Sequence, residues 1–294
     1  MDIGKLAAWV LINEFAAPEA AALARRLEGL GYGTLWIPEA FGRDPMVAAS
    51  WLLANTTTLA VATGIANTYA RYALAMVGAQ YGLNEQSGGR FLLGIGISHA
   101  MLVEGMRGHR YRPPLAEMQA YLGAMAAVQY SGVQPPAKPP TVIAALGPKM
   151  LEVARDMADG AHPYNVTPGH TARAREILGP GKLLLVEQKC VLESDPAKAR
   201  AIGRRAIGHS INLPNYRNSF LRMGFSAGDL ENGGSDRLID GLIAWGDEAA
   251  IRRRIQEHRD AGADQVCIQV LGKQGMRLSE DDLKLFELLA PAKG

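Results

Sequence analysis

The stretch RFLLGIGISH, which runs from Arg90 to His99, decides the fold expected for the chain. Residues 91–97 carry no polar side chain, a pattern that fits either a buried helix or a strand buried on both faces. The two glycines favour the strand, because glycine costs a helix interior roughly 1 kcal/mol relative to alanine, whereas at a strand end it admits another backbone or a ligand. We therefore predict a buried parallel strand that opens onto a site at Ser98 and His99.

The other segments alternate between strand-like and helix-like patterns. Further strands are predicted from apolar runs at 6–12, 34–39, 59–67, 141–146, 160–165, 182–192 and 265–271. Helical periodicity and helix-start residues predict helices at 18–31, 45–54, 73–86, 113–130, 148–158 and 170–178. Residues 99–112 are expected to form a loop, and roughly 197–240 a helical insertion after the seventh strand.

Strands that alternate with helices in this way require a parallel sheet. Its commonest closed form is the (β/α)8 TIM barrel, an α/β fold that accommodates 294 residues as one domain, 1–294, and binds ligands at the carboxyl ends of its strands. The residues predicted at those ends are mostly polar: Asn13, Glu39, Asn67, Ser98, His99, Gly147, Tyr164, Asn165 and Glu187. A site would explain this polarity, but so would the simple fact that loops begin there.

Composition argues against several classes of partner and location. The 31 basic and 29 acidic residues leave a net charge of +2 without a basic stripe, so neither nucleic acid nor an anionic membrane is the expected partner. No apolar run approaches the ~18 residues of a membrane span, and the amino terminus lacks the features of a secretory signal. Cys190 and Cys267 lie far apart in apolar segments, which fits buried thiols in a reducing cytoplasm.

Common catalytic and metal-binding motifs are not found. The six histidines show no His-x-His or His-x-x-x-His spacing with partner carboxylates, so no metal site is expected. The Gly-x-Ser-x-Gly elbow of many hydrolases is missing too. A dinucleotide-binding motif starting at Gly94 would need a third glycine where His99 stands. A glycine turn with Ser98 and free backbone N–H groups can still hold a phosphate, although plain strand packing is the alternative.

His99 is the best candidate for acid–base chemistry, since an imidazole both accepts and donates protons near neutral pH. Its structural alternative is a histidine that caps a turn. Glu39 is placed to orient a hydroxyl or a ring nitrogen, or else to form an ion pair with Arg43. Arg71 could bind an anionic substrate through its bidentate fork or serve as a structural charge. For His162, which could point inward, a structural role is favoured.

These patterns together resemble the luciferase-like family of flavin and deazaflavin oxidoreductases, and in particular its coenzyme F420-dependent, actinobacterial branch. The likeness covers nearly the whole chain. Its specific stretches are LWIPE (35–39), ATGIAN (62–67) with AR (70–71), GGRFLLGIGISH (88–99), AALGPKM (144–150) and AGADQV (261–266).

The resemblance implies a barrel, often homodimeric, that transfers a hydride between coenzyme F420 and a small organic substrate. It also implies a cis peptide bond at Gly64–Ile65, against which the cofactor ring lies. The cofactor-binding residues it implies are Glu39, Thr63, Gly64, Ile65, Asn67, Gly96, Ile97, Ser98, His99, Leu146, Gly147, Lys149 and Met150. Tyr69, Arg71 and Tyr164 would face the substrate. FMN in a luciferase-like monooxygenase, or a non-catalytic flavin-binding barrel, are the alternatives.

Two positions depart from the sugar-phosphate dehydrogenases of this family. Those enzymes have a histidine proton donor where this chain has Ala40, and a glutamate where it has His99. Sugar-phosphate oxidation therefore does not carry over to this chain. His99, as the proton carrier, and Glu39, beside the ring, are left as the expected catalytic residues.

Overall fold

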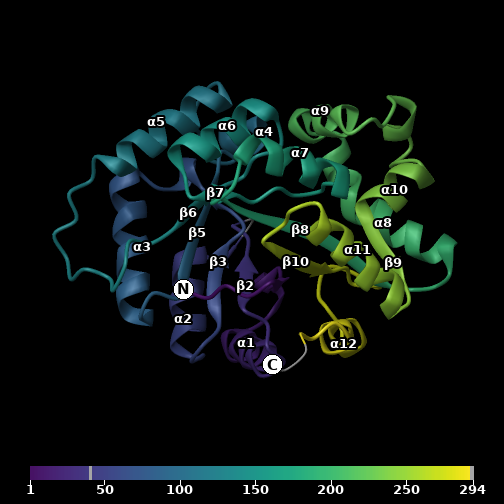
Figure 1. Cartoon of the computed structure of the whole chain (residues 1–294), viewed down its shortest axis with the longest axis horizontal. Coiled ribbons are helices and arrows are strands. Elements are labelled where there is room, and N and C mark those ends of the chain that lie inside the picture. The colour runs from purple at the N-terminus through teal and green to yellow at the C-terminus, as the bar shows by residue number, and fades with distance from the viewer. Residues whose placement is uncertain (40–41, 292–294) are drawn as a thin grey trace.

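The structure is a computed structural model, and it describes residues 1–39 and 42–291. Eight parallel strands close into a barrel, because the last of them, β10, pairs with both β8 and β1. The predicted (β/α)8 fold is confirmed (Figure 1). In barrel order the strands are β1 (Leu6–Trp9), β2 (Thr34–Ile37), β3 (Ala60–Thr63), β5 (Phe91–Gly96), β6 (Thr141–Ile143), β7 (Gly160–Ala161), β8 (Leu183–Leu192) and β10 (Gln265–Val270).

The third strand position differs from the continuous strand predicted at 59–67. It consists of β3 and of β4 (Ala66–Asn67), and both pair with β5. Between them the Gly64–Ile65 peptide bond is cis, as the resemblance implies. The interruption turns the backbone at the carboxyl end of the barrel, where Gly64 and Ile65 face the site described below.

Helices cover the outside of the barrel, and most begin where the sequence places a proline or a capping side chain. The Asp44 carboxylate accepts hydrogen bonds from Met46 N and Val47 N at the start of its helix. Thr167 caps another helix in the same way. The helices up to β8 are α1 (Ala17–Gly29), α2 (Pro45–Ala54), α3 (Ala73–Ser87), α4 (Ala100–Gly105), α5 (Pro114–Ala126), α6 (Pro148–Met157) and α7 (Pro168–Leu178).

Two local predictions after β5 are wrong. The expected loop at 99–112 contains the short helix α4, which the His99 carbonyl starts by accepting hydrogen bonds from Leu102 N and Val103 N. Helix α5 ends at Ala126 rather than near 130. The residues that follow it, VQYSGVQPP at 128–136, include β-branched residues, glycine and prolines, which do not extend a helix.

The chain between β8 and β10 forms α8 (Pro196–Ile211), α9 (Pro214–Arg222), α10 (Asp236–Leu242), β9 (Ile243–Gly246) and α11 (Glu248–Asp260), and α12 (Glu280–Leu288) follows β10. Helices α8 and α10 lie beside β9 at one side of the barrel (right of Figure 1). Strand β9 extends the sheet by pairing with the distal half of the ten-residue β8, and the sequence does not predict it. A separate apolar cluster that includes Ile207, Phe220 and Ile239 holds this region together.

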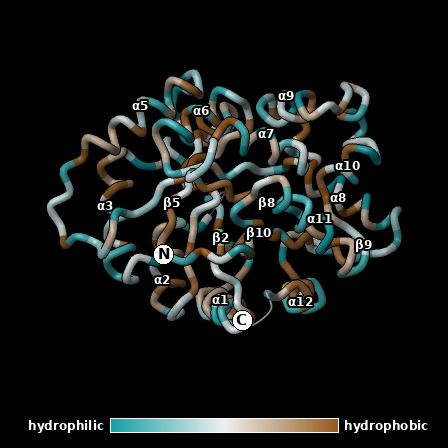
Figure 2. Tube along the Cα trace, viewed as in Figure 1, coloured by the Kyte–Doolittle hydropathy of each residue, from teal (hydrophilic) through white to brown (hydrophobic). Residues whose placement is uncertain are grey.

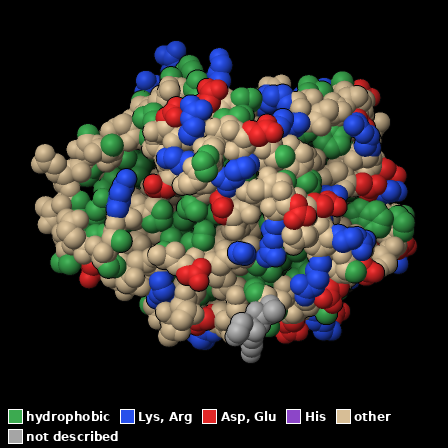
Figure 3. Space-filling model, in the orientation of Figure 1, with side chains coloured by type: hydrophobic (Ala, Val, Ile, Leu, Met, Phe, Trp, Pro, Cys, Tyr) green, Lys and Arg blue, Asp and Glu red, His purple; other side chains and the backbone are tan. Residues whose placement is uncertain are grey.

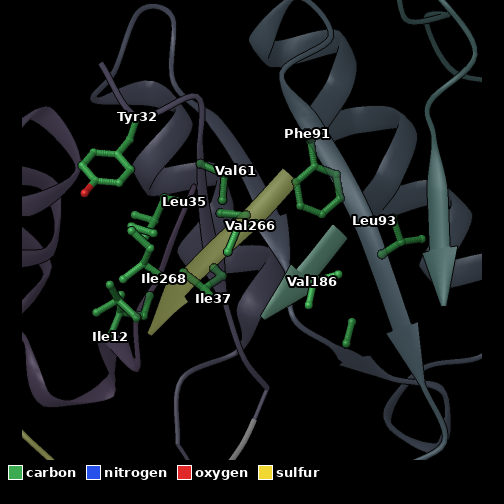
Figure 4. Packing of buried hydrophobic residues seen from close by; sticks show 14 of the residues in the cluster. Ile12, Tyr32, Leu35, Ile37, Val61, Phe91, Leu93, Val186, Val266 and Ile268 are labelled. Atoms are coloured by element: carbon green, nitrogen blue, oxygen red, sulfur yellow. The ribbon is translucent and has the colours of Figure 1, made fainter. Parts of the chain in front are cut away.

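The core has two layers. Alternate residues such as Leu35, Val61 and Phe91 point outward and pack against the helices (Figure 4). Their neighbours Trp36 and Leu92 belong to a smaller cluster made of strand residues, which fills the barrel interior. Because both faces are covered, most strands are largely hydrophobic, as brown segments in Figure 2 show, whereas β8 carries the polar residues Glu187, Gln188 and Lys189.

The surface carries both signs of charge. Figure 3 shows basic and acidic side chains mixed over the face it views. Within residues 1–39 and 42–291, no helix combines the length and hydropathy needed to cross a membrane. The same residues contain no group of three or more side chains suited to a metal ion.

Candidate functional site

A cavity opens at the carboxyl ends of the barrel strands, where the fold places ligand sites. It has two adjoining chambers of about 330 and about 660 Å3. The smaller chamber extends from the end of β5 past the loop before α6 to helix α9. The larger lies over β1, β2 and the β3–β4 turn, and beneath α4. The residues that line both chambers are Ile65, Ser98, His99, Ala144, His162, Tyr164 and Tyr216.

Glycines shape the floor of this cavity. A Cβ on Gly64 would lie 2.7 Å from Trp9 Nε1 and 3.1 Å from His162 Nε2, so no side chain fits there. A Cβ on Gly96 would lie 2.6 Å from the Ile65 side chain. Gly94 is required for a different reason: a Cβ on it would lie 2.0 Å from the Thr63 carbonyl oxygen. Gly64 and Gly96 therefore make room for neighbouring side chains at the cavity floor, and Gly94 allows two strands to approach.

His99 lies on the shared wall, where it is half-buried. Burial lowers its pKa, nearby His209 lowers it further, and a hydrogen bond with Asn215 partly offsets both. The imidazole ring is 5.8 Å from the ring of Tyr216 on α9. Ser98, directly before it, has the positive φ of 64° that is rare outside glycine. The lowered pKa favours the neutral imidazole, and His99 lines both chambers.

Glu39 lies at the edge of the larger chamber, and its carboxylate is engaged by protein groups. Its Oε2 accepts hydrogen bonds from Arg71 Nη1 at 2.8 Å and from Asn67 N at 2.7 Å. Arg107 Nη2 is 3.9 Å from Oε1. The alternative expectation of an ion pair with Arg43 is wrong, since Arg43 donates instead to the Phe15 carbonyl at 2.9 Å.

Most of the expected site residues line the cavity: Glu39, Gly64, Ile65, Gly96, Ile97, Ser98, His99, Leu146, Gly147, Met150 and Tyr164. Five others are not among the residues that line it: Thr63, Asn67, Tyr69, Arg71 and Lys149. The Thr63 hydroxyl bonds to Gly94, Asn67 Oδ1 accepts from Tyr69 N, and the Tyr69 hydroxyl accepts from Arg112 N. Lys149 is exposed on α6, and Arg71 binds Glu39 and Asp44. Ligand contacts by these five remain predictions.

Comparison with known proteins agrees with the family resemblance found in the sequence. Residues 3–265 match the family model described as luciferase-like monooxygenase. The chain belongs to the luciferase-like monooxygenase family. It is 27% identical over 191 residues to a Mycobacterium tuberculosis protein named for coenzyme F420-dependent oxidoreductase activity; the match covers 55% of each, so the chain spans about half the length of that relative.

Two further known proteins, one matched by sequence and one by fold, match over more of their length. The chain is 26% identical to 5,10-methylenetetrahydromethanopterin reductase of Methanolobus tindarius, over 79% of this chain and 77% of that one. Its fold resembles that of an F420-dependent secondary alcohol dehydrogenase in complex with an F420-acetone adduct, with a TM-score of 0.76 and 15% identity over 99% and 98% of the two chains.

Helix α9 of this luciferase-like barrel contributes cavity residues that the sequence did not reveal. Asn215, Asn218 and Arg222 line the smaller chamber from one side of the helix. Arg222 Nη2 lies 3.5 Å from where a Cβ on Gly147 would be, and Gly147 is the N-cap of α6. A guanidinium beside a helix N-terminus suits an anion. The available signal was the spacing of three and four residues between these polar side chains, which places them on one helical face.

Beneath the cavity of this family member lies a buried ion pair. Lys189 Nζ is 3.1 Å from Glu187 Oε1 and 3.6 Å from the centre of the Tyr164 ring. Burial lowers the pKa of Lys189, while Glu187 opposes the shift. The Tyr164 hydroxyl donates to Gln269 Oε1 at 2.9 Å. Tyr164 therefore presents its ring, rather than its hydroxyl, to a ligand in the cavity.

Proposed function

We propose that the protein is a coenzyme F420-dependent oxidoreductase that transfers a hydride between C5 of the deazaflavin and a small organic substrate. The observation that carries the proposal is the two-chambered cavity, whose chambers meet at Ile65, Ser98 and His99. Its shape suits a flat ring with a polar tail plus a second small molecule. The names of the relatives support F420 as the cofactor.

The chain's own residues fit such a cofactor. Gly64 and Gly96 line the cavity and carry no side chain, so that a flat ring can approach the backbone there. Gly147, the start of α6 and Arg222 form an electropositive end of the smaller chamber for a phosphate-bearing tail. When bound, F420 supplies a carbon centre, C5, that gives or takes a hydride in a two-electron step.

His99 is the proposed proton carrier. As a neutral imidazole it has one nitrogen that accepts a proton and one that donates a hydrogen bond. It lies on the wall shared by the chambers, so it reaches a substrate placed against the ring. Tyr216 on α9 lines both chambers beside it. Glu39 acts by fixing Arg71 and the backbone of Asn67 at the rim.

We also propose that the chain forms a single domain that works as a homodimer in the cytoplasm. Val47 and Trp51 on α2, with Tyr72 and Leu74 at the start of α3, expose apolar side chains that a second copy would cover. Light scattering after size-exclusion chromatography measures the mass directly. A mass close to 31.5 kDa would mean a monomer.

The activity is tested by mixing the protein with reduced F420 and a panel of enones, imines and aldehydes, and with oxidised F420 and a panel of alcohols. The proposal predicts a substrate-dependent change in the deazaflavin absorbance in one of the two directions. Oxygen consumption with reduced FMN instead would indicate the monooxygenase alternative. Tight cofactor binding without transfer to any compound would indicate a flavin-binding barrel.

A further inference from the structure

One tryptophan at the cavity floor differs from the other three in the chain. The indole N–H groups of the other three each donate to a protein oxygen: Trp36 to Gln265 Oε1, Trp51 to the Ala17 carbonyl and Trp245 to Asp240 Oδ1. Trp9 Nε1 is buried and has no acceptor among the described residues. Buried N–H groups are rarely left unpaired, because their desolvation is then uncompensated.

His162 has the complementary feature. Its Nδ1 lies 2.7 Å from the Leu185 carbonyl oxygen, which can only accept, so Nδ1 carries the proton and Nε2 carries a lone pair. Nε2 is buried and has no donor among the described residues. The ring stacks on Trp36 at 4.1 Å and 8°. Burial lowers the pKa of His162 to about 4, so the lone pair is available at neutral pH.

The unpaired donor and the unpaired acceptor meet at Gly64. Trp9 Nε1 and His162 Nε2 lie 2.7 and 3.1 Å from the same point, the position a Cβ on Gly64 would take. Both side chains line the larger chamber. The two nitrogens therefore lie close together beside Gly64, and a ligand edge that carries an acceptor and an adjacent donor matches their hydrogen-bonding chemistry. Such an edge is offered by a lactam, in which a carbonyl oxygen and an N–H group are neighbours.

We propose that Trp9 and His162 bind the lactam edge of the pyrimidine ring of the redox cofactor. Trp9 Nε1–H donates to a ring carbonyl oxygen, and His162 Nε2 accepts from the neighbouring ring N–H. This inference rests on the proposed function and deepens it. The two hydrogen bonds fix the orientation of the cofactor ring where it lies against Gly64. Because flavins and deazaflavins share this edge, the pair does not select between them.

The test follows the indole N–H signals of protein labelled with 15N-tryptophan, and Trp9→Phe identifies the Trp9 signal. The ligand is the F420 chromophore lacking the phosphate and its tail. The Trp9 signal should move downfield on binding, while the other three, already paired within the protein, stay in place. A Trp9 signal that does not move in the saturated complex would overturn the inference.

Binding affinities give a second readout. Trp9→Phe and His162→Phe, which keeps the ring stacked on Trp36, should each weaken chromophore binding by roughly five- to fiftyfold, the range expected for losing one buried hydrogen bond. His162→Gln retains an acceptor and should bind within a few-fold of the wild type. Trp51→Phe is the matched control, with unchanged affinity. The proposed pair of hydrogen bonds would be overturned if the wild type and both Phe variants bound the chromophore with equal affinity. It would also be overturned if His162→Gln bound no more tightly than His162→Phe.

Failure of this inference is distinguishable from failure of the proposed function. If the wild-type protein binds neither F420 nor FMN, the proposed function and the pair fail together. If the wild type binds F420 but the Trp9 signal and the variant affinities do not respond, only the pair fails. A Trp9 signal that moves only when an alcohol substrate is added to the saturated complex would assign the two nitrogens to the substrate hydroxyl and overturn the ring contact.

Discussion

Arg71 Nη1 lies 2.8 Å from Glu39 Oε2, and both side chains are nearly buried. The same guanidinium also pairs with Asp44, and the Tyr121 hydroxyl donates to the Arg71 carbonyl at 2.8 Å. The charge expected from sequence to meet an anionic substrate is thus neutralised by two carboxylates of the protein. A third anion would have to displace one of them.

Replacing Arg71 should therefore affect stability first. Arg71→Met leaves Glu39 without its main partner and should lower the free energy of unfolding by about 1–3 kcal/mol, measured by urea denaturation. Arg110→Met, an exposed arginine on the loop after α4, should stay within about 0.5 kcal/mol of the wild type. Unchanged stability with a raised KM for an anionic substrate would instead place Arg71 at the substrate.

Gly64 should tolerate no side chain. Gly64→Ala brings a Cβ to 2.7 Å from Trp9 Nε1, and we expect a loss of about 1–3 kcal/mol together with weaker cofactor binding. Gly82→Ala is the matched control, since nothing lies within 4 Å of its Cβ in α3. It should stabilise the protein by about 0.5–1 kcal/mol. Thermal unfolding of the two variants should shift in opposite directions; shifts of equal sign and size would remove the steric account.

His99→Ala should reduce kcat while cofactor affinity stays within a few-fold. Because burial holds the pKa of His99 below its usual value, the wild type should keep the neutral imidazole down to mildly acidic pH. If His99 accepts the proton, kcat should fall as the pH drops through this lowered pKa, and the variant should lack that step. A pH profile of kcat shared by variant and wild type would take His99 out of the mechanism.

The sequence predicts the barrel because its information is local and repeated. Apolar runs mark the strands, prolines at helix starts and glycines at strand ends recur in many of the units, and the strands fall close to where these signals place them. What the sequence misses depends on contacts between distant segments. Strand β9 is paired only because β8 runs past the barrel, and α9 lies over the cavity only because the chain returns there.

In the candidate site, too, the sequence predicts what is local and misses what depends on distant contacts. Ser98 and His99 directly follow a strand that the sequence predicts, so the sequence identifies them as site residues. The alternative role of Glu39, an ion pair with Arg43 four residues away, is wrong, because the guanidinium that binds it comes from Arg71, 32 residues along the chain. In the sequence, Trp9 and His162 look like core residues. Only the closed barrel shows that their side-chain nitrogens lie beside Gly64 and have no hydrogen-bond partner among the described residues.

Acid should destabilise the fold through its buried histidines. Burial lowers the pKa of His162 to about 4 and that of His258 to about 3, whereas an unfolded histidine has a pKa near 6.5. Between these values the unfolded state binds more protons, so the free energy of unfolding should fall as the pH drops from about 6.5 to 4. Urea denaturation at pH 7 and pH 5 measures the loss, and His162→Phe should make it smaller. An equal loss in the variant would mean that His162 titrates normally.

Arg222 should contribute to binding of the cofactor tail. Arg222→Met should weaken F420 binding about three- to thirtyfold, and less at high salt, because a partly exposed charge is screened. Its effect on the tail-less chromophore should be negligible. Arg217→Met, on the same helix but away from the cavity lining, is the control. Equal losses for both ligands would place Arg222 at the ring rather than at the tail.

Cofactor binding is the central claim, and calorimetric titration tests it most directly. F420 and FMN are titrated separately into the same purified protein. We predict saturable binding of one F420 per chain, at least about tenfold tighter than FMN, which corresponds to roughly 1.4 kcal/mol. Tighter binding of FMN, or no heat with either cofactor, would contradict the account.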